Sequence, residues 1–122
     1  MPVIPTMEVS IRDLKGVTVV TIKGSVDALS ADGLTVELAE QVESGRIHLV
    51  ADFSGVEYIS SAGLRAILAT AKQARQSGGD FRLAALRPNV QRIAELSGFT
   101  TILKFFGEME SAVASYGPEG HI

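Results

Sequence analysis

Two kinds of hydrophobic period alternate along this chain, and their alternation restricts the folds that it can adopt. Residues 46–55 (RIHLVADFSG) place apolar side chains at every second position, which is the period of a β-strand. The segment that starts at Leu64 has apolar residues at i, i+3, i+4 and i+7, which is the spacing of one helix face. Strands that alternate with helices through short connections pair in parallel through crossovers. The sequence therefore predicts an α/β domain with a largely parallel sheet.

The complete pattern predicts elements in the order β-β-α-β-α-β-α-β-α. We expect strands over residues 7–14, 17–24, 46–55, 81–86 and 101–106. We expect the first helix between Ser30, as its N-cap, and Gly45, and the second before the breaker SGGD at 77–80. The third helix should run from Pro88 to Gly98, and the last over residues 108–115. The first two strands should form an antiparallel hairpin.

Length and composition fit one globular domain. The chain has 122 residues, of which 46% are hydrophobic and 20% charged, as expected for a domain with a single core. We expect the domain to span residues 7–115, with loose tails over 1–6 and 116–122. Cysteine is absent, which excludes disulfides and thiolate metal sites and is typical of a reducing cytoplasm.

Charge and hydropathy argue against nucleic acid, metals and membranes as partners. The formal net charge is −3 and basic residues are interspersed with acidic ones, so no basic stripe faces a phosphate backbone. His48 and His121 form no metal-ligand cluster. The first residues lack the features of a signal peptide, and no apolar run approaches the roughly 20 residues of a membrane span. We therefore expect a cytoplasmic protein without metal, cofactor or membrane insertion.

The segment EYISSAGLRAIL (57–68) puts two serines where a strand gives way to a helix. Functional groups of α/β sheets collect beyond the carboxyl ends of parallel strands, so Ser60 and Ser61 are candidate site residues. Either serine could instead cap the helix, because its hydroxyl accepts a hydrogen bond from an unpaired backbone N–H. A helix start also carries a partial positive charge and tolerates an added phosphate. Capping and phosphorylation are therefore compatible interpretations.

Catalytic and nucleotide-binding interpretations find little support in the sequence. A serine nucleophile needs a G-x-S-x-G elbow and a histidine, but the elbow is absent and His48 lies inside an expected strand. The glycines of SGGDF (77–81) follow a helix, whereas those of a phosphate-binding loop precede one. Asp27 and Asp52 stand near strand ends, where they are expected as turn residues, caps or hydrogen-bond acceptors. The residues alone predict a small α/β domain whose functional spot is Ser60 and Ser61, with acidic neighbours.

Three blocks of sequence carry a family resemblance: KGSVDALSADGL (23–34), DFSGVEYISSAGLRAIL (52–68) and GGDFRLAALRPNVQRIAELSGF (78–99). In this order they resemble the anti-anti-sigma factors, which are bacterial anti-sigma factor antagonists built on a STAS domain. The resemblance runs from about Met7 to Ser115. It implies a mixed sheet with helices chiefly on one side. It also implies binding to an anti-sigma factor, commonly a serine kinase, and thereby release of a sigma factor for transcription.

The resemblance implies a switch at the strand-to-helix junction. In the family this junction is usually Asp-Ser-Ser/Thr-Gly; the kinase phosphorylates the first hydroxyl residue after the aspartate, and a serine phosphatase removes the phosphate. Ser60 stands at the aspartate position, Ser61 at the modified serine and Ala62 at the second hydroxyl, and Gly63 completes the junction. Ser61 is therefore the expected phosphorylation site, with Ser60 as second choice. The missing aspartate implies an altered kinase preference or the loss of this regulation.

The resemblance extends the partner-binding surface beyond the junction. Asp27 aligns with an acidic residue in the family's partner-facing region, and Asp52 is carried over as a neighbour. We expect a monomer or weak dimer. Two other functions stay open: an unphosphorylated STAS module that acts as a scaffold or as a subunit of another assembly, such as a lipid-transport complex, and a module that binds a small ligand or nucleotide.

Overall fold

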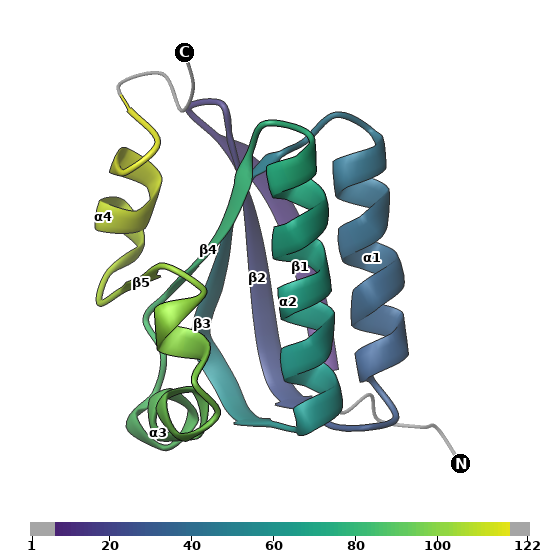
Figure 1. Cartoon of the computed structure of the whole chain (residues 1–122), viewed down its shortest axis with the longest axis vertical. Coiled ribbons are helices and arrows are strands. Elements are labelled where there is room, and N and C mark those ends of the chain that lie inside the picture. The colour runs from purple at the N-terminus through teal and green to yellow at the C-terminus, as the bar shows by residue number, and fades with distance from the viewer. Residues whose placement is uncertain (1–6, 118–122) are drawn as a thin grey trace.

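A computed structural model describes residues 7–117 and contains a five-stranded sheet flanked by helices (Figure 1). The strands are β1 (Met7–Leu14), β2 (Val17–Val26), β3 (His48–Ile59), β4 (Asp80–Ala84) and β5 (Phe105–Phe106). The helices are α1 (Ala31–Glu43), α2 (Ser61–Gln76), α3 (Pro88–Leu96) and α4 (Met109–Ala114), and a short 3-10 helix spans Phe99–Thr101. The order of the strands and α-helices is the predicted one.

The strands lie side by side in the order β1-β2-β3-β4-β5, and the sheet is mixed. β1 and β2 pair antiparallel around Lys15-Gly16, where both residues have positive φ, 55° and 83°. Positive φ at both positions is the geometry of the tight turn that joins such strands. The other neighbouring strands pair in parallel, and α1, α2 and α3 supply the crossovers. The predicted mixed α/β fold is confirmed.

The two faces of the sheet are covered unequally. α1, α2 and α3 pack on one face over the main core, which includes the fully buried rings of Phe53 and Phe81. α4 packs on the other face against a smaller cluster that includes Val19 and Val50 (Figure 1). The helices therefore lie chiefly on one side, as the resemblance implies. The apolar face predicted for residues 46–55 points into the main core.

β3 is longer than the predicted 46–55. Its pairing with β2 contains two irregularities, between Thr21 and Lys23 and between Gly24 and Ser25, and each inserts one extra residue in β3. Such bulges bend a strand and occur often beside functional sites. With these two bulges the pairing of β3 with β2 continues to Ile59. β3 therefore ends only two residues before α2 begins at Ser61.

The predicted strand over residues 101–106 is too long. Phe99–Thr101 form the 3-10 helix instead, and Leu103 is buried in the main core. Only Phe105–Phe106 remain to pair with β4. The N–H groups of Ile102 and Leu103 both donate hydrogen bonds to the Phe99 carbonyl oxygen, so the chain is coiled here and cannot extend the strand. None of the helices within residues 7–117 is long and apolar enough to cross a bilayer.

The sequence predicts that Tyr116 lies in a loose tail, but the structure shows that it is held in place. Its side chain is buried, and its hydroxyl oxygen lies 2.8 Å from each of the carbonyl oxygens of Leu49 and Asp80. The Arg82 guanidinium lies 3.9 Å from the centre of the Tyr116 ring. These contacts fasten the end of α4 to β3 and β4. Residues 1–6 and 118–122, also expected to be loose, lie outside the described residues.

Candidate functional site

The carboxyl ends of β2 and β3 bring two turns together at the lower end of the sheet in Figure 1. Val26, the last residue of β2, pairs with Ile59, the last residue of β3. The Ser60 N–H continues this pairing and donates a hydrogen bond to the Val26 carbonyl oxygen at 2.8 Å. Asp27 follows one strand and Ser61 follows the other, so the two turns form one candidate site at this end.

Ser60 is the N-cap of α2. Its backbone is extended, with φ −88° and ψ 170°, and its Oγ accepts a hydrogen bond from the Gly63 N–H at 3.1 Å. The side chain is half-buried. An N-cap hydroxyl satisfies one of the backbone donors that a helix start leaves unpaired. The capping interpretation is therefore correct for Ser60, and its hydroxyl is engaged.

Ser61 differs from Ser60 in every one of these respects. It is the first residue of α2, it is exposed, and its hydroxyl takes part in no hydrogen bond within residues 7–117. The first turn of α2 contains no acidic residue, so no carboxylate of this turn offsets the partial positive charge of the helix start. The Ser61 hydroxyl is therefore free to react and stands where added negative charge is favourable.

Gly63 holds the start of α2 directly against the two strand ends. A Cβ atom at this position would lie 2.7 Å from Val26 Cγ1, 2.8 Å from Ile59 Cγ1 and 3.2 Å from the Val26 carbonyl oxygen. Real Cβ atoms essentially never approach within 3.0 Å, so only glycine fits without displacement. Ala62, which precedes it, is half-buried. The close approach fixes where Ser61 emerges from the surface.

Asp27 caps the turn that leads into α1. Its Oδ1 accepts hydrogen bonds from the N–H groups of Leu29 at 3.0 Å and Ser30 at 2.9 Å, and the Asp27 N–H donates to Ser30 Oγ at 2.9 Å. This exchange is the reciprocal arrangement of a capping box. The hydrogen bond from the Ser30 N–H is the main cause that lowers the pKa of Asp27. Ser30 stands at the N-cap position of α1, as predicted, but its side chain makes no cap hydrogen bond, and Asp27 supplies the acceptor instead.

Asp52 does not lie with the other predicted site residues. It pairs with Thr21 and Ala84 in the middle of the sheet, and its Oδ1 accepts a hydrogen bond from the Ser54 N–H at 2.9 Å. Ala84 belongs to the cluster on the α4 face, and paired residues share a face. Asp52 therefore faces away from α2. The structure brings Asp27 to the strand-to-helix junction but does not bring Asp52 there.

Two exposed apolar side chains near the junction escape notice in the sequence, one in the turn before α1 and one at the end of β3. Leu29 is 92% exposed between Asp27 and α1, and Tyr58 is 47% exposed two residues before Ser60. The available signal was a leucine inside the polar turn DALSADG. Exposed apolar side chains gathered at one end of a sheet mark a candidate surface for a protein partner.

α3 supports the site from the side of β3. The Arg87 side chain donates a hydrogen bond to the Ser54 carbonyl oxygen at 3.0 Å, and the Asn89 side chain donates to the Glu57 carbonyl oxygen at 2.8 Å. These bonds satisfy backbone acceptors of the bulged part of β3.

Within residues 7–117, no group of three or more His, Asp or Glu side chains could hold a metal ion.

Comparison with known proteins agrees with this architecture. The family model of the STAS domain matches residues 8–112. The Bordetella bronchiseptica protein named "Putative anti-sigma factor antagonist BtrV" is 37% identical over 110 residues, which cover 90% of this chain and 95% of that protein. The crystal structure of an anti-sigma factor antagonist from Mycobacterium paratuberculosis superposes with a TM-score of 0.82 at 27% identity, over 89% of this chain and 92% of that one.

More distant structures share the fold alone. The anti-sigma factor antagonist SpoIIAA in its unphosphorylated form has a TM-score of 0.76 at 14% identity, covering 88% of this chain and 95% of that one. The Bacillus cell fate determinant SpoIIAA in the phosphorylated form has a TM-score of 0.69 at the same identity, covering 88% of this chain and 98% of that one. The family model and the 37%-identical relative each cover nearly the whole described structure. The chain therefore belongs to the STAS domain family.

Proposed function

We propose that this protein is an anti-sigma factor antagonist: in the cytoplasm it binds an anti-sigma factor, which releases a sigma factor, and phosphorylation of Ser61 ends the binding. Its action is binding and not catalysis. The relatives that cover nearly its whole length carry this functional name. The partner is an anti-sigma factor with serine kinase activity, and a serine phosphatase restores the unmodified form.

The contrast between Ser60 and Ser61 is the observation that carries the proposed switch. Ser60 Oγ is half-buried and bonded to the Gly63 N–H, whereas Ser61 is exposed with an unengaged hydroxyl. Phosphate on Ser61 adds about −1.5 to −2 charge at the positive end of α2, so it leaves the helix intact. SpoIIAA, a protein of the same fold, is known in a phosphorylated form.

The switch needs no rearrangement of the antagonist. A hundredfold loss of affinity corresponds to about 2.7 kcal/mol. A phosphate that loses its water against a closely fitted partner supplies a penalty of this size through unpaired charge. The chemical change at Ser61 is therefore sufficient, and the sheet and helices stay as they are.

The binding surface comprises the two turns around Ser61, with Leu29 as its apolar anchor. At 92% exposure Leu29 makes little contact with its own chain. Its burial in a complex therefore gains affinity without being needed for the fold. We expect Leu29→Ala to weaken anti-sigma factor binding about tenfold or more while the free energy of unfolding changes by less than about 0.5 kcal/mol.

The phosphorylation site is tested with three proteins: wild type, Ser61→Ala and Ser60→Ala. Each is incubated with ATP, Mg²⁺ and the anti-sigma kinase that wild-type protein captures from its own cells, and intact mass is measured. We expect a gain of about 80 Da for wild type and for Ser60→Ala, and none for Ser61→Ala. Modification of Ser61→Ala to the wild-type extent would contradict the assignment of the switch to Ser61.

A further inference from the structure

β1 has an unpaired outer edge within residues 7–117. It is the first strand of the sheet and pairs with β2 alone. It is eight residues long and contains no proline, so every second residue directs its backbone N–H and C=O away from the sheet. An edge of this kind is a template for another strand unless its side chains prevent pairing. The side chains of β1 therefore decide which strand fits.

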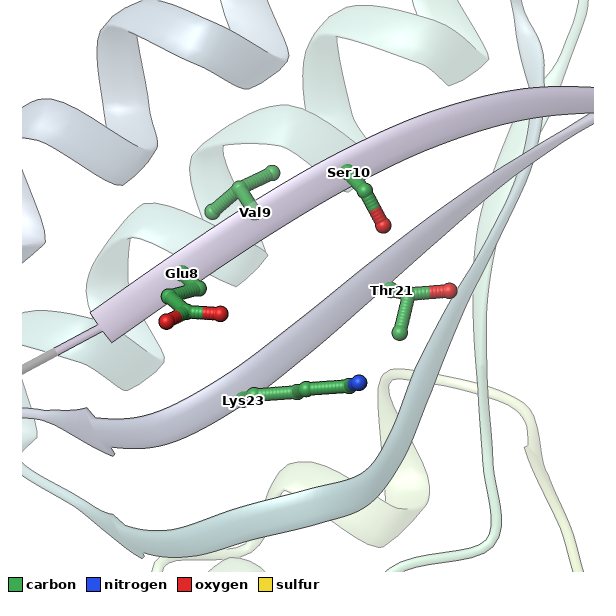
Figure 2. Close-up of a pocket in the computed structure, with 5 residues that line it drawn as sticks. All are labelled: Glu8, Val9, Ser10, Thr21 and Lys23. Atoms are coloured by element: carbon green, nitrogen blue, oxygen red, sulfur yellow. The ribbon is translucent and has the colours of Figure 1, made fainter.

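Glu8 and Arg12 are exposed charges of opposite sign on the same face of β1. Figure 2 shows Glu8 and Ser10 on the open face of the β1-β2 hairpin, with Val9 on the opposite face. Arg12 continues the Glu8 face because alternate residues of a strand share a face. Both ion pairs within residues 7–117 involve Asp80, so neither Glu8 nor Arg12 forms an ion pair there, although Lys23 of β2 is the cross-strand neighbour of Glu8. The two charges lie symmetrically on either side of Ser10.

We propose that β1 pairs antiparallel with β1 of a second copy of this chain, about a two-fold axis at Ser10. In this register Glu8 of each copy faces Arg12 of the other, so two cross-strand ion pairs form. On the face toward the helices, Val9 faces Ile11 of the other copy, and both side chains are only half-buried in one chain. The pairing joins two sheets into one continuous sheet.

The position of the charges selects this register among the possible ones. In β1, every second residue points its backbone N–H and C=O groups outward, and in an antiparallel pair such residues face each other. Two facing residues are therefore an even number of positions apart in the sequence, so the two-fold axis passes through a residue and not between two residues. An axis at Glu8 or at Arg12 would place like charges opposite each other. An axis at Val9 or Ile11 would leave both charges without a charged residue opposite. Only the axis at Ser10 places a charge of opposite sign opposite both Glu8 and Arg12. The charges therefore favour β1 of a second copy of this chain over other strands as the partner.

Sedimentation velocity of the full chain over a concentration series up to about 1 mM tests the dimer. We expect concentration-dependent dimerisation of wild type. Glu8→Arg and Arg12→Glu should each raise the dissociation constant by roughly tenfold or more, because like charges then face each other twice per dimer. Glu37→Arg makes the same change of charge on the exposed side of α1 and should have no effect. A wild type that stays monomeric throughout, or a Glu8→Arg protein that dimerises like wild type, overturns the proposal.

Mixing the two single variants provides a test that misfolding cannot imitate. In a dimer of one Glu8→Arg chain and one Arg12→Glu chain, both arginines of the first chain, at positions 8 and 12, face glutamates of the second. We expect the mixture to form a heterodimer at concentrations where neither variant dimerises alone. Two variants that stay monomeric after mixing, while wild type dimerises, would overturn this register.

Cysteine cross-linking locates the axis, because the natural chain has no cysteine. Facing residues of antiparallel strands have Cα atoms about 4.5–5.5 Å apart, within the roughly 4.4–6.8 Å that a disulfide spans. Under mild oxidation Ser10→Cys should therefore form a covalent dimer. Thr21→Cys is the matched control: Thr21 pairs with Ser10 one strand farther from the edge, and it should cross-link little. Equal cross-linking of the two variants would overturn the axis at Ser10.

Discussion

Gly63 and Gly33 occupy the same place in two helices but should respond in opposite ways to substitution by alanine. Each is the third residue of its helix, Gly63 in α2 and Gly33 in α1. A Cβ at Gly33 meets nothing within 4 Å, whereas a Cβ at Gly63 would lie 2.7 Å from Val26 Cγ1 and 2.8 Å from Ile59 Cγ1. The two substitutions therefore share the gain in helix propensity and differ only in packing.

The magnitudes follow from these contacts. Replacing glycine by alanine in a helix contributes up to about 1 kcal/mol. An extra methyl group in a packed interior costs about 1–3 kcal/mol. The upper half of that range applies to Gly63→Ala, because Val26 and Ile59 are fully buried and their β-branched side chains are stiff. The Val26 carbonyl oxygen, 3.2 Å from the added Cβ, restricts the site further. We expect Gly63→Ala to destabilise the fold by about 1–2 kcal/mol and Gly33→Ala to stabilise it by about 0.5–1 kcal/mol.

Urea unfolding followed by circular dichroism measures both changes on the same scale. For a chain of this size, 1 kcal/mol corresponds to a shift of roughly 3–6 °C in Tm, so thermal unfolding gives a second reading. Stabilisation of both variants to the same extent would refute the reasoning, because it would mean that the start of α2 is not held tightly against β2 and β3.

Three further predictions concern the same architecture. Ser60→Ala should destabilise the fold by about 1 kcal/mol in urea unfolding because the α2 cap is lost, whereas Ser61→Ala should change it by less than about 0.5 kcal/mol. Tyr116→Phe should cost about 1–3 kcal/mol by the same measurement, since the buried carbonyl groups of Leu49 and Asp80 lose the one O–H donor that they share. Burial opposes ionisation of Asp80, but hydrogen bonds from Arg82 and Arg75 outweigh it and lower its pKa below 3.8. Its ionised form therefore stabilises the fold above about pH 3.8 and less as the pH falls, so Asp80→Asn should flatten the acid limb of the stability curve.

Much of the fold could be predicted because the local signals agree with the tertiary structure. The period of residues 46–55, the amphipathic spacing from Leu64 and the turn at Lys15-Gly16 each have one structural solution, and the structure adopts it. The end of β3 was harder to predict, because a bulge depends on the pairing with β2 and leaves no mark in the period. Tyr116 escaped prediction because its partners, Leu49 and Asp80, are distant in the sequence.

The site was predicted in part for the same reason. The serines of the junction follow a strand and precede a helix, so local pattern was enough to find them. Which serine caps the helix depends on the exact first residue of α2, which periodicity does not fix. Asp52 looked like a neighbour because it is near in sequence, but the alternation of side chains along β3 turns it to the other face.

The central claim is that one phosphate on Ser61 separates the antagonist from its anti-sigma factor. Isothermal titration of the purified anti-sigma factor with unmodified protein, with protein phosphorylated on Ser61 and with Ser61→Ala measures this directly. We expect the phosphorylated form to bind at least about a hundredfold more weakly, a difference of about 2.7 kcal/mol, and Ser61→Ala to bind like the unmodified protein. Equal affinities of the phosphorylated and unmodified forms would contradict the account.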